Sequence, residues 1–241
     1  MIKVLAALFM LIDHIGLILF PQSIDYRIIG RLSMPLFAYS VARGFHYSKQ
    51  KGTVRGYARK LLIFALVSQV PYAFMSGDGF ALNIGFTWLL AVAFLDAVVS
   101  VMARKRKDAS LYCSSLIARS ESLPHGEEGK EPVFAVLACV LTLAVLLPVD
   151  YGLYGVLFPV MFYLLLFRWN RPQYVFLVMT LLYALYSLMG GSVIQAFSLV
   201  SWPVLLIARR YDDKIKVPRR FFYWFYPTHI AALLAVKALL G

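Results

Sequence analysis

Nine apolar stretches, each close to the length needed to cross a bilayer, constrain this chain more than any other feature. A membrane-spanning helix needs about 20 predominantly apolar residues. The stretches cover residues 4–20, 28–45, 61–75, 84–103, 133–149, 152–167, 174–189, 192–208 and 221–240. The chain is 61% hydrophobic and only 15% charged, whereas soluble domains are about 45–50% apolar and 25% charged. The sequence therefore predicts an all-α polytopic membrane protein with about nine transmembrane helices in one bundle.

The positive charges indicate how this bundle is oriented. The formal net charge is +12, which in a soluble protein would suggest nucleic-acid binding. Here 21 of the 24 Lys and Arg residues fall on the same side of the membrane as Lys3, if each predicted helix crosses it in turn. By the positive-inside rule, the N-terminus is cytoplasmic and the C-terminus external. We expect a multi-pass protein of the inner or plasma membrane whose basic face meets anionic lipid, with no nucleic-acid partner.

The longest connection is the polar segment 104–132, which contains RKRK and EEGKE. Its few apolar residues bury too little surface to offset the entropy of ordering, so we expect a flexible cytoplasmic loop. No internal repeat is evident, and residues 1–241 are read as one domain. The spacing of Cys113 and Cys139 predicts neither a disulfide framework nor a metal site.

Asp13 and His14 are the first candidates for chemistry because they lie in the middle of an apolar stretch. An ionisable residue there costs roughly 2 to 3 kcal/mol, so a functional site is the default hypothesis. Adjacent helix positions point about 100° apart, so each residue needs its own partner. Arg31 lies within reach of Asp13 in the next stretch. This pair either contributes to a site or only locks two helices together.

A second histidine lies at matching depth in the aromatic run FFYWFYPTH of residues 221–229. Counted from the basic ends of their helices, His14 and His229 both lie roughly 14 to 16 Å along the helix axis. Both are therefore near the midplane of a hydrocarbon core about 30 Å thick. Pro227 is expected to kink this helix just before His229. Two histidines at one depth, one of them beside a carboxylate, indicate a functional pair.

Two further acids accompany these groups. Asp96 lies at membrane depth, where an acid normally faces a partner or water. Asp150 and Tyr151 fall at the external end of two helices, either at the mouth of a cleft or in a tight helix-helix turn. The chain has no P-loop, dinucleotide-binding, GxSxG or HExxH motif, so nucleotide hydrolysis, dinucleotide chemistry and zinc hydrolysis lack support.

Several motifs together resemble one family. They are DHIG at 13–16, IGRLSMPLFAY at 29–39, RGYARKLLIFALVSQVPY at 55–72, LNIGFTWLL at 82–90, DYGLYGVLFPVMFY at 150–163 and YWFYPTHI at 223–230. In this order they resemble the TraX family and, more distantly, the superfamily of transmembrane acyltransferases. The resemblance implies transfer of an acetyl group from cytoplasmic acetyl-CoA to an acceptor such as the N-terminal amine of a pilin. His14, Asp13, Arg31, Asp150 and His229 fall on the recurring polar motifs of the family.

Together these features predict an acetyl-CoA-dependent acetyltransferase that acts on an amine or hydroxyl of a peptide, pilin-like or envelope acceptor. His14 is the predicted general base. His229 either holds the thioester oxygen or assists proton transfer, and the Asp13–Arg31 pair positions the second helix. The predicted substrate-binding residues are Asp150, Tyr151, Tyr226 and Asp96. Basic residues predicted to hold the CoA phosphates are Arg55, Arg59 and Lys60, or Arg219 and Arg220.

Other classes of protein remain as alternatives. One is a proton-coupled transporter or flippase that relays protons through Asp13, His14 and Asp96. Another is a haem protein in which the two mid-membrane histidines ligate iron. A purely structural assembly factor is a further alternative.

Overall fold

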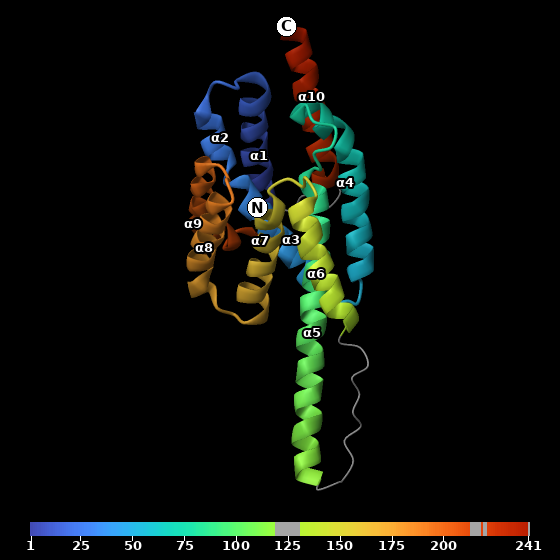
Figure 1. Cartoon of the computed structure of the whole chain (residues 1–241). Coiled ribbons are helices and arrows are strands. Elements are labelled where there is room, and N and C mark those ends of the chain that lie inside the picture. The colour runs from blue at the N-terminus through green and yellow to red at the C-terminus, as the bar shows by residue number, and fades with distance from the viewer. Residues whose placement is uncertain (119–130, 213–217, 219–220, 241) are drawn as a thin grey trace.

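The protein is described by a computed structural model over residues 1–118, 131–212, 218 and 221–240 (Figure 1). Its helices are α1 (Ile2–Leu19), α2 (Ile24–Gly30), α3 (Ser33–Gln50), α4 (Val54–Ser76), α5 (Ile84–Ala118), α6 (Glu131–Leu146), α7 (Gly152–Phe162), α8 (Val175–Leu188), α9 (Ser201–Arg209) and α10 (Phe221–Leu240). Three further helical segments are η1 (Tyr163–Arg168), η2 (Pro172–Tyr174) and η3 (Val193–Val200). The prediction of an all-α fold is confirmed for the described residues.

Three helical segments in the described part of the chain are long and apolar enough to cross a membrane. They are Ile2–Leu19, Val54–Ser76 and Ile84–Ala103. Shorter apolar helical segments are Ala135–Leu146, Gly152–Arg168, Pro172–Leu188 and Val193–Arg209. Many large apolar side chains on α4, α8 and α9 point outward, which is typical of helices that face lipid. The chain is a membrane protein, and nine crossings stay a prediction.

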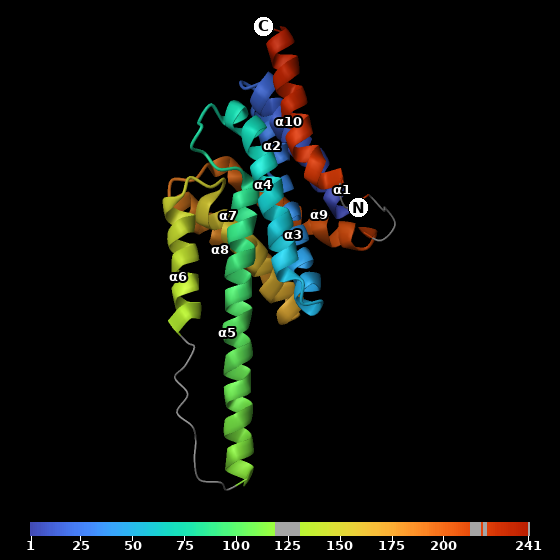
Figure 2. The ribbon, with the colours of Figure 1, turned by 90° about the vertical axis from the view of Figure 1, so that its right-hand side faces the viewer.

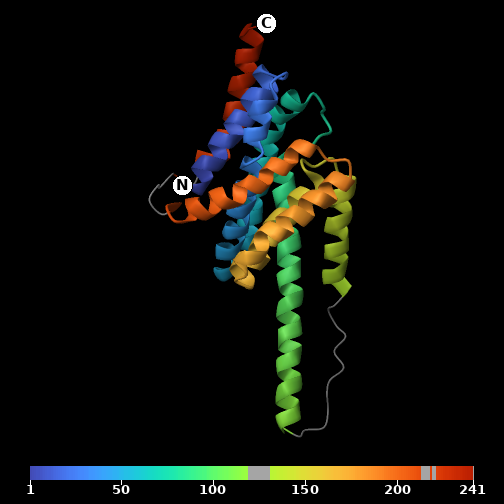
Figure 3. The same cartoon turned by 90° about the vertical axis from the view of Figure 1, so that its left-hand side faces the viewer.

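Two groups of helices meet in the middle of the bundle. Helix α1 packs against α2, α3 and α10, whereas α5 packs against α4, α6 and α7, and the contact between α3 and α7 joins the groups. Figure 2 shows α10 crossing beside α1 and α4, and Figure 3 shows α8 and α9 together on the opposite side. Two segments far apart in the sequence are therefore brought together: the middle of α1 and the middle of α10.

The predicted helix over 28–45 is wrong in one respect, because the helix is interrupted at Arg31 and Leu32. Helix α2 ends at Gly30, and α3 begins at Ser33. Pro35 explains the break, since it has no N–H to donate to the Arg31 carbonyl and its ring would clash with that carbonyl in a continuous helix. Arg31 therefore lies in a helix interruption and not inside a helix.

The expected flexible loop over 104–132 is also corrected. Helix α5 continues through residues 104–118 and extends far beyond its neighbours (Figure 1). This segment contains no Gly or Pro and is rich in Arg, Lys, Ala and Leu, which favour helix. Charge alone does not break a helix that leaves the apolar layer. Residues 119–130 lie outside the described part of the chain.

The predicted helix over 192–208 divides into a 3₁₀ segment, η3, followed by α9. Pro203 is the physical reason, because it cannot donate a hydrogen bond to the Leu199 carbonyl of a continuous α-helix. The predicted helix over 152–167 likewise changes its winding, from α7 to the π-type segment η1. The N-terminal ends of η3 and α7 both lie beside polar residues of the candidate site, Gln195 and Tyr151.

Candidate functional site

The Asp13 carboxylate on α1 holds two arginines from the α2 region. Arg31 Nη2 donates to Asp13 Oδ1 at 2.9 Å, and Arg27 Nη1 donates to Oδ2 at 2.8 Å. The predicted Asp13–Arg31 ion pair is confirmed. Arg27 was not predicted, although its position four residues before Arg31 places both side chains on one helical face. The carboxylate is thus shared by two guanidinium groups, and Asp13 and Arg31 are buried.

Gly30 permits this ion-pair cluster because it brings α2 against α1. A Cβ at this position would overlap the Asp13 side chain, including its carboxyl group. A larger residue would therefore push the two helices apart or displace the carboxylate. The close approach of Gly30 sets the position of Asp13 relative to both arginines.

Arg31 extends the cluster toward α7 and η3. Its Nη1 donates to the Tyr151 hydroxyl at 3.2 Å and to Gln195 Oε1 at 3.3 Å. The Gln195 amide in turn donates to the Tyr154 hydroxyl at 3.5 Å. Gln195 is fully buried, so this network satisfies polar groups that would otherwise be costly. It ties the helix interruption at Arg31 to three other elements.

Asp150 and Tyr151 lie in the connection between α6 and α7, beside the same cluster. The Leu82 carbonyl accepts from the Asp150 backbone N–H at 2.9 Å, and Thr87 Oγ1 donates to the Asp150 carbonyl at 2.7 Å. Tyr151 has φ of 61°, a left-handed conformation that non-glycine residues adopt only under strain and mostly at functional sites. The two residues do occupy a tight turn, and this turn faces the cluster.

Burial raises the pKa of the Asp150 carboxyl to about 7, even though the nearby Arg31 charge opposes this shift. The residue lies outside both flanking helices and is half-buried. An acid with such a pKa changes its charge within the physiological range. Asp150 is therefore neutral below this pH and anionic above it.

The two predicted histidines meet directly, since His14 Nδ1 and His229 Nε2 lie 2.6 Å apart. His229 Nδ1 lies 2.6 Å from the Phe225 carbonyl oxygen, and because a carbonyl only accepts, Nδ1 carries the proton. In the neutral pair His229 Nε2 is then the acceptor, and His14 Nδ1 donates to it. His14 Nε2 is left unprotonated, with no hydrogen bond to a described residue. It is the nitrogen that can take a proton from a substrate.

This geometry separates two roles that the sequence left open for His229. Both of its ring nitrogens are occupied, one by His14 and one by the backbone of Phe225. In the neutral pair, no ring N–H of His229 is left to donate to a thioester oxygen. Orientation of His14 and assistance in proton transfer are the roles that its contacts allow.

A small cavity of about 50 Å³, the inner cavity, adjoins these residues. Its lining includes Asp13, His14, Asp150, Tyr151, Trp88 and Tyr226. The predicted site residues on α1, on α10 and in the α6–α7 connection therefore surround one space.

The inner cavity adjoins a second cavity of about 110 Å³, the apolar channel. The two share Met10, Phe37, Trp88 and Tyr226 in their linings. Beyond the channel lies an open cavity of about 810 Å³, the basic vestibule. Residues common to the channel and the vestibule are Lys3, Ser40, Gly44, Tyr57, Phe222 and Tyr223. The three cavities thus lie next to one another between the basic ends of the helices and His14.

The charged residues of the vestibule differ from those predicted to bind CoA. Among the described residues, its lining includes the cations Lys3, Arg43, Lys51 and Lys60. Lys60 was predicted and lines the vestibule, whereas the exposed Arg55 and Arg59 on the same helix do not. Their register on α4 explains the difference, because neighbouring helix positions face different sides. Arg219 and Arg220 lie outside the described residues.

Asp212 is the acid of the vestibule among the described residues. Its carboxylate accepts from the terminal amine of Met1 at 2.9 Å, from the Ile2 N–H at 3.0 Å, and from Arg43. Although burial opposes ionisation, these hydrogen bonds lower the pKa of Asp212 below its usual range. The contacts join the start of α1 to α3 and to the end of α9, and they fix the Arg43 guanidinium at the wall of the vestibule.

Asp96 is the predicted site residue that the structure does not bring into this cluster. Its carboxylate accepts from Lys49 Nζ at 2.7 Å, and both side chains are partly exposed. The ion pair with Lys49 thus explains why an acid is tolerated at this position. The proton relay through Asp13, His14 and Asp96 that a transporter would use is not assembled.

The contact between the histidines also bears on the haem alternative. An iron between two imidazoles would require two metal–nitrogen bonds of roughly 2 Å each, whereas the facing nitrogens are 2.6 Å apart. They are close enough for a direct hydrogen bond and too close to ligate one iron from opposite sides. The arrangement favours proton transfer between the rings.

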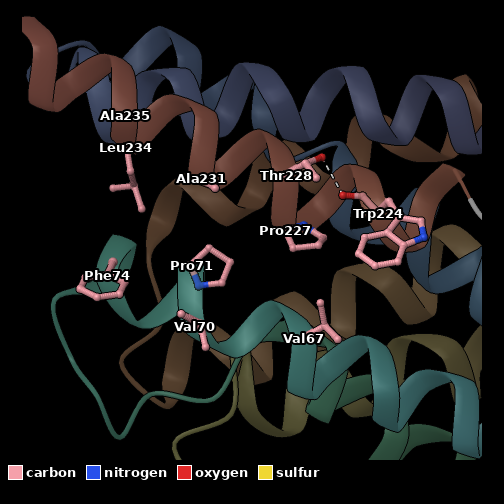
Figure 4. A pocket seen from close by; sticks show the side chains of 10 residues that line it. All are labelled: Val67, Val70, Pro71, Phe74, Trp224, Pro227, Thr228, Ala231, Leu234 and Ala235. Atoms are coloured by element: carbon pink, nitrogen blue, oxygen red, sulfur yellow. Dashed lines mark hydrogen bonds between the residues drawn. The ribbon is translucent and has the colours of Figure 1, made fainter.

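An apolar groove of about 660 Å³ lies between α4 and α10 (Figure 4). Pro71 and Pro227 lie on its two walls, and Trp224 and Phe74 lie toward its ends. None of the residues that line it is titratable. The groove therefore lacks side chains that could take up or release a proton.

The fold and these cavities define a helical membrane protein with a buried histidine pair, an ion-pair cluster and a basic vestibule. The chain matches the model of the family described as TraX protein over residues 1–237 and belongs to this family. A 70-residue segment, 29% of the chain, is 40% identical to an uncharacterised protein of Rickettsia prowazekii (strain Madrid E). This match spans about a quarter of the relative's length. No solved structure matches the chain.

Proposed function

We propose that this protein is a membrane-embedded acetyltransferase that moves an acetyl group from cytoplasmic acetyl-CoA to an amine or hydroxyl of a peptide, pilin-like or envelope acceptor. Membership of the TraX family suggests a pilin-modifying or conjugation-related membrane protein. The observation that carries the finer proposal is that the vestibule, the channel and the inner cavity, which contains His14 in its lining, are neighbours that share lining residues. The protein crosses the inner or plasma membrane several times, with the vestibule open to the cytoplasm.

The shape and charge of these three cavities suit a CoA thioester. The nucleotide end of CoA carries several phosphate charges, and Lys51 and Lys60 in the vestibule provide ammonium groups that attract them. The pantetheine arm is thin and mostly uncharged, which matches a channel lined by Val41, Leu61 and Phe64. The thioester then lies at the inner cavity, beside His14.

The reaction is a nucleophilic substitution at the thioester carbonyl. The acceptor nitrogen or oxygen attacks the carbonyl carbon while His14 Nε2 takes the proton of the acceptor. The new bond joins acceptor and acetyl group, the carbon–sulfur bond breaks, and the leaving CoA thiolate takes a proton from His14. His229 accepts from His14 Nδ1 throughout and delocalises the positive charge toward the Phe225 carbonyl.

The ion-pair cluster positions the acceptor side of the site. Asp13 and Arg31 fix the α2–α3 interruption, and Arg31 holds the Tyr151 hydroxyl. Asp150 and Tyr151 line the inner cavity from the α6–α7 connection. They are the residues best placed to contact an acceptor that enters opposite the donor.

The test compares acetyl groups in cells that lack the gene with those in cells that carry one variant. Mass spectrometry of secreted peptides and envelope glycans should reveal an acetyl increment that is lost on deletion and restored by the wild-type gene. The rate with His14→Ala should fall about 100- to 10,000-fold, because a general base is removed. His46→Ala is the matched control, since His46 lines none of the three cavities. Unchanged acetylation with His14→Ala present in the membrane would contradict the proposal.

A further inference from the structure

The reaction proposed above leaves one group without a protein partner. Attack on the thioester places negative charge on the carbonyl oxygen, and enzymes that transfer acyl groups stabilise this charge with fixed N–H or O–H donors. His229 has no free ring N–H for this purpose, and Ser33 Oγ already donates to the Ala6 carbonyl at 2.9 Å. Other donors at the inner cavity must serve.

Four residues line both the apolar channel and the inner cavity, at the point where a thioester would meet His14. Met10 and Phe37 are apolar, and the other two, Trp88 and Tyr226, carry donor groups. Trp88 comes from α5 and Tyr226 from α10, so the two residues reach this junction from different helices.

Both donors lack a partner in the described structure. The Trp88 side chain is buried, with 7% of its surface exposed, and its Nε1 has no hydrogen-bond partner. A buried N–H of this kind is costly and rare unless it has a function. The Tyr226 hydroxyl makes no hydrogen bond to a described residue, and the residue is 4% exposed.

Aromatic packing fixes both side chains in place. The Trp88 ring packs against Phe37 and Phe64, with centroid separations of 5.6 Å and 6.3 Å. The Tyr226 ring lies edge-on to both histidines, 5.9 Å from His14 and 5.8 Å from His229. Donors held this firmly need no reorganisation during the reaction, which is the condition for effective stabilisation of charge.

We propose that Trp88 Nε1–H and the Tyr226 hydroxyl form the oxyanion hole, donating to the acetyl carbonyl oxygen of the bound thioester and to the oxyanion that develops on it. The inference rests on the proposed acetyl transfer and adds two residues that touch the reacting group. The acceptor attacks the carbonyl carbon, the carbonyl π electrons move to the oxygen held by Trp88 and Tyr226, and they return as the carbon–sulfur bond breaks. His14 moves the proton, as described above.

The test measures acetyl transfer in membrane vesicles from cells that lack the chromosomal gene and express one variant. The vesicles receive radiolabelled acetyl-CoA, and incorporation into their own acceptors is followed at increasing donor concentration. Tyr226→Phe removes only a hydroxyl, and Trp88→Phe keeps an aromatic ring without the N–H. Each should lower the maximal rate about 10- to 1,000-fold, with the half-saturating acetyl-CoA concentration changed less than about threefold.

Trp224→Phe is the matched control. Trp224 lies on the same helix as Tyr226 and lines the groove between α4 and α10, but it lines none of the vestibule, the channel and the inner cavity. The maximal rate of this variant should stay within about twofold of the wild type, because the indole N–H that it loses does not reach the reacting oxygen. Thermal unfolding of each variant in detergent checks that the fold is retained.

The outcomes separate this inference from the proposed function. Wild-type incorporation that depends on His14, together with undiminished rates for Tyr226→Phe and Trp88→Phe, would overturn the oxyanion hole alone. A weaker affinity for acetyl-CoA at an unchanged maximal rate would also overturn it, because the residues would then only bind the donor. Wild-type incorporation no greater than that of His14→Ala would remove both proposals.

Discussion

At the scale of single residues, the charge balance around Asp13 decides how this part of the molecule responds to substitution. One buried carboxylate faces two guanidinium groups, Arg27 and Arg31. Loss of Arg31 leaves Asp13 paired with Arg27. Loss of the Asp13 carboxylate leaves both arginines without this counter-charge. The acid is therefore more important for the charge balance than either arginine alone.

We predict that Asp13→Asn lowers the free energy of unfolding more than Arg31→Gln. Breaking a buried ion pair by removing one partner typically costs about 3 to 5 kcal/mol, and Arg27 limits this cost when Arg31 is replaced. The double variant Asp13→Asn with Arg31→Gln should recover part of the loss, because one of the uncompensated cations is removed as well. Thermal unfolding of the purified protein in detergent measures all three.

Two outcomes of the unfolding measurements would contradict this prediction. If Arg31→Gln is as destabilising as Asp13→Asn, Arg27 contributes nothing to the charge balance. If the double variant shows the plain sum of the two single effects, Asp13 and Arg31 do not interact.

The residues found from the sequence are those whose burial is costly in itself. Asp13, His14 and His229 lie within apolar stretches, so polarity alone identified them. Gln195 lies in a predicted helix too, but an amide there is easily explained by helix packing. Trp88 was missed because tryptophan is common in membrane helices, and only the structure reveals that its N–H lacks a partner.

At the scale of elements, the turn between α6 and α7 combines strain with an unusual acid. Tyr151 and Gly152 both have positive φ angles, of 61° and 49°. The pairing of Leu82 with Val149 holds the turn against the connection before α5. This short bridge fixes Asp150 beside the inner cavity, where burial raises its pKa to about 7.

We predict that Asp150 makes the protein less stable as the pH rises from about 4 to about 7. An unfolded aspartate ionises near pH 3.9, whereas the folded protein keeps this proton until about pH 7. Between these values the unfolded chain binds fewer protons, so the free energy of unfolding falls with increasing pH. Above about pH 7 both states are ionised and the contribution is constant.

Asp150→Asn tests this, because the amide stays neutral. Melting temperatures of wild type and variant are compared at pH 5 and pH 8. The melting temperature of the variant, relative to that of the wild type, should be higher at pH 8 than at pH 5. The other titrating groups are the same in both proteins and cancel in this comparison. Parallel pH profiles for the two proteins would show that Asp150 ionises normally in the folded state.

The positions of helices were largely predictable, and their interruptions were not. Long apolar runs located the spans of α1, α4 and α5. The break at Arg31 was missed because hydropathy does not register a proline at the start of α3, and Pro35 disrupts hydrogen bonding without changing the apolar pattern. The extension of α5 was missed for the opposite reason, since composition suggested disorder where helix propensity was high.

At the scale of the whole molecule, the vestibule, the channel and the inner cavity depend on packing between elements distant in sequence. Its walls come from α1, α3, α4, α5 and α10. Hydropathy predicts which residues lie in the membrane but not which helices are neighbours. That His14 and His229 lie level with each other was therefore predictable, and so was the presence of basic residues at one end. The residues that face the vestibule depend on helix rotation, which the sequence did not specify.

The last prediction concerns the donor and follows from this rotation. Lys51→Gln with Lys60→Gln should raise the apparent constant for acetyl-CoA about 2- to 30-fold, because each partly solvated charge pair contributes about 0.2 to 1 kcal/mol. The maximal rate should change little, since these groups bind the nucleotide equally in the ground state and the transition state. The wild-type constant should also rise with salt, and the double variant should be less sensitive to it.

Arg55→Gln with Arg59→Gln is the matched control for this experiment. It removes the same charge from the same end of the molecule, but neither residue lines the vestibule. Acetyl-CoA titrations at two ionic strengths should therefore give a wild-type constant for the control and a raised constant for Lys51→Gln with Lys60→Gln. Equal effects of the two pairs would mean that only the overall positive charge of this face attracts the donor. No effect of either pair would place the CoA phosphates away from the vestibule, while the proton chemistry of His14 and His229 would still stand on its own geometry.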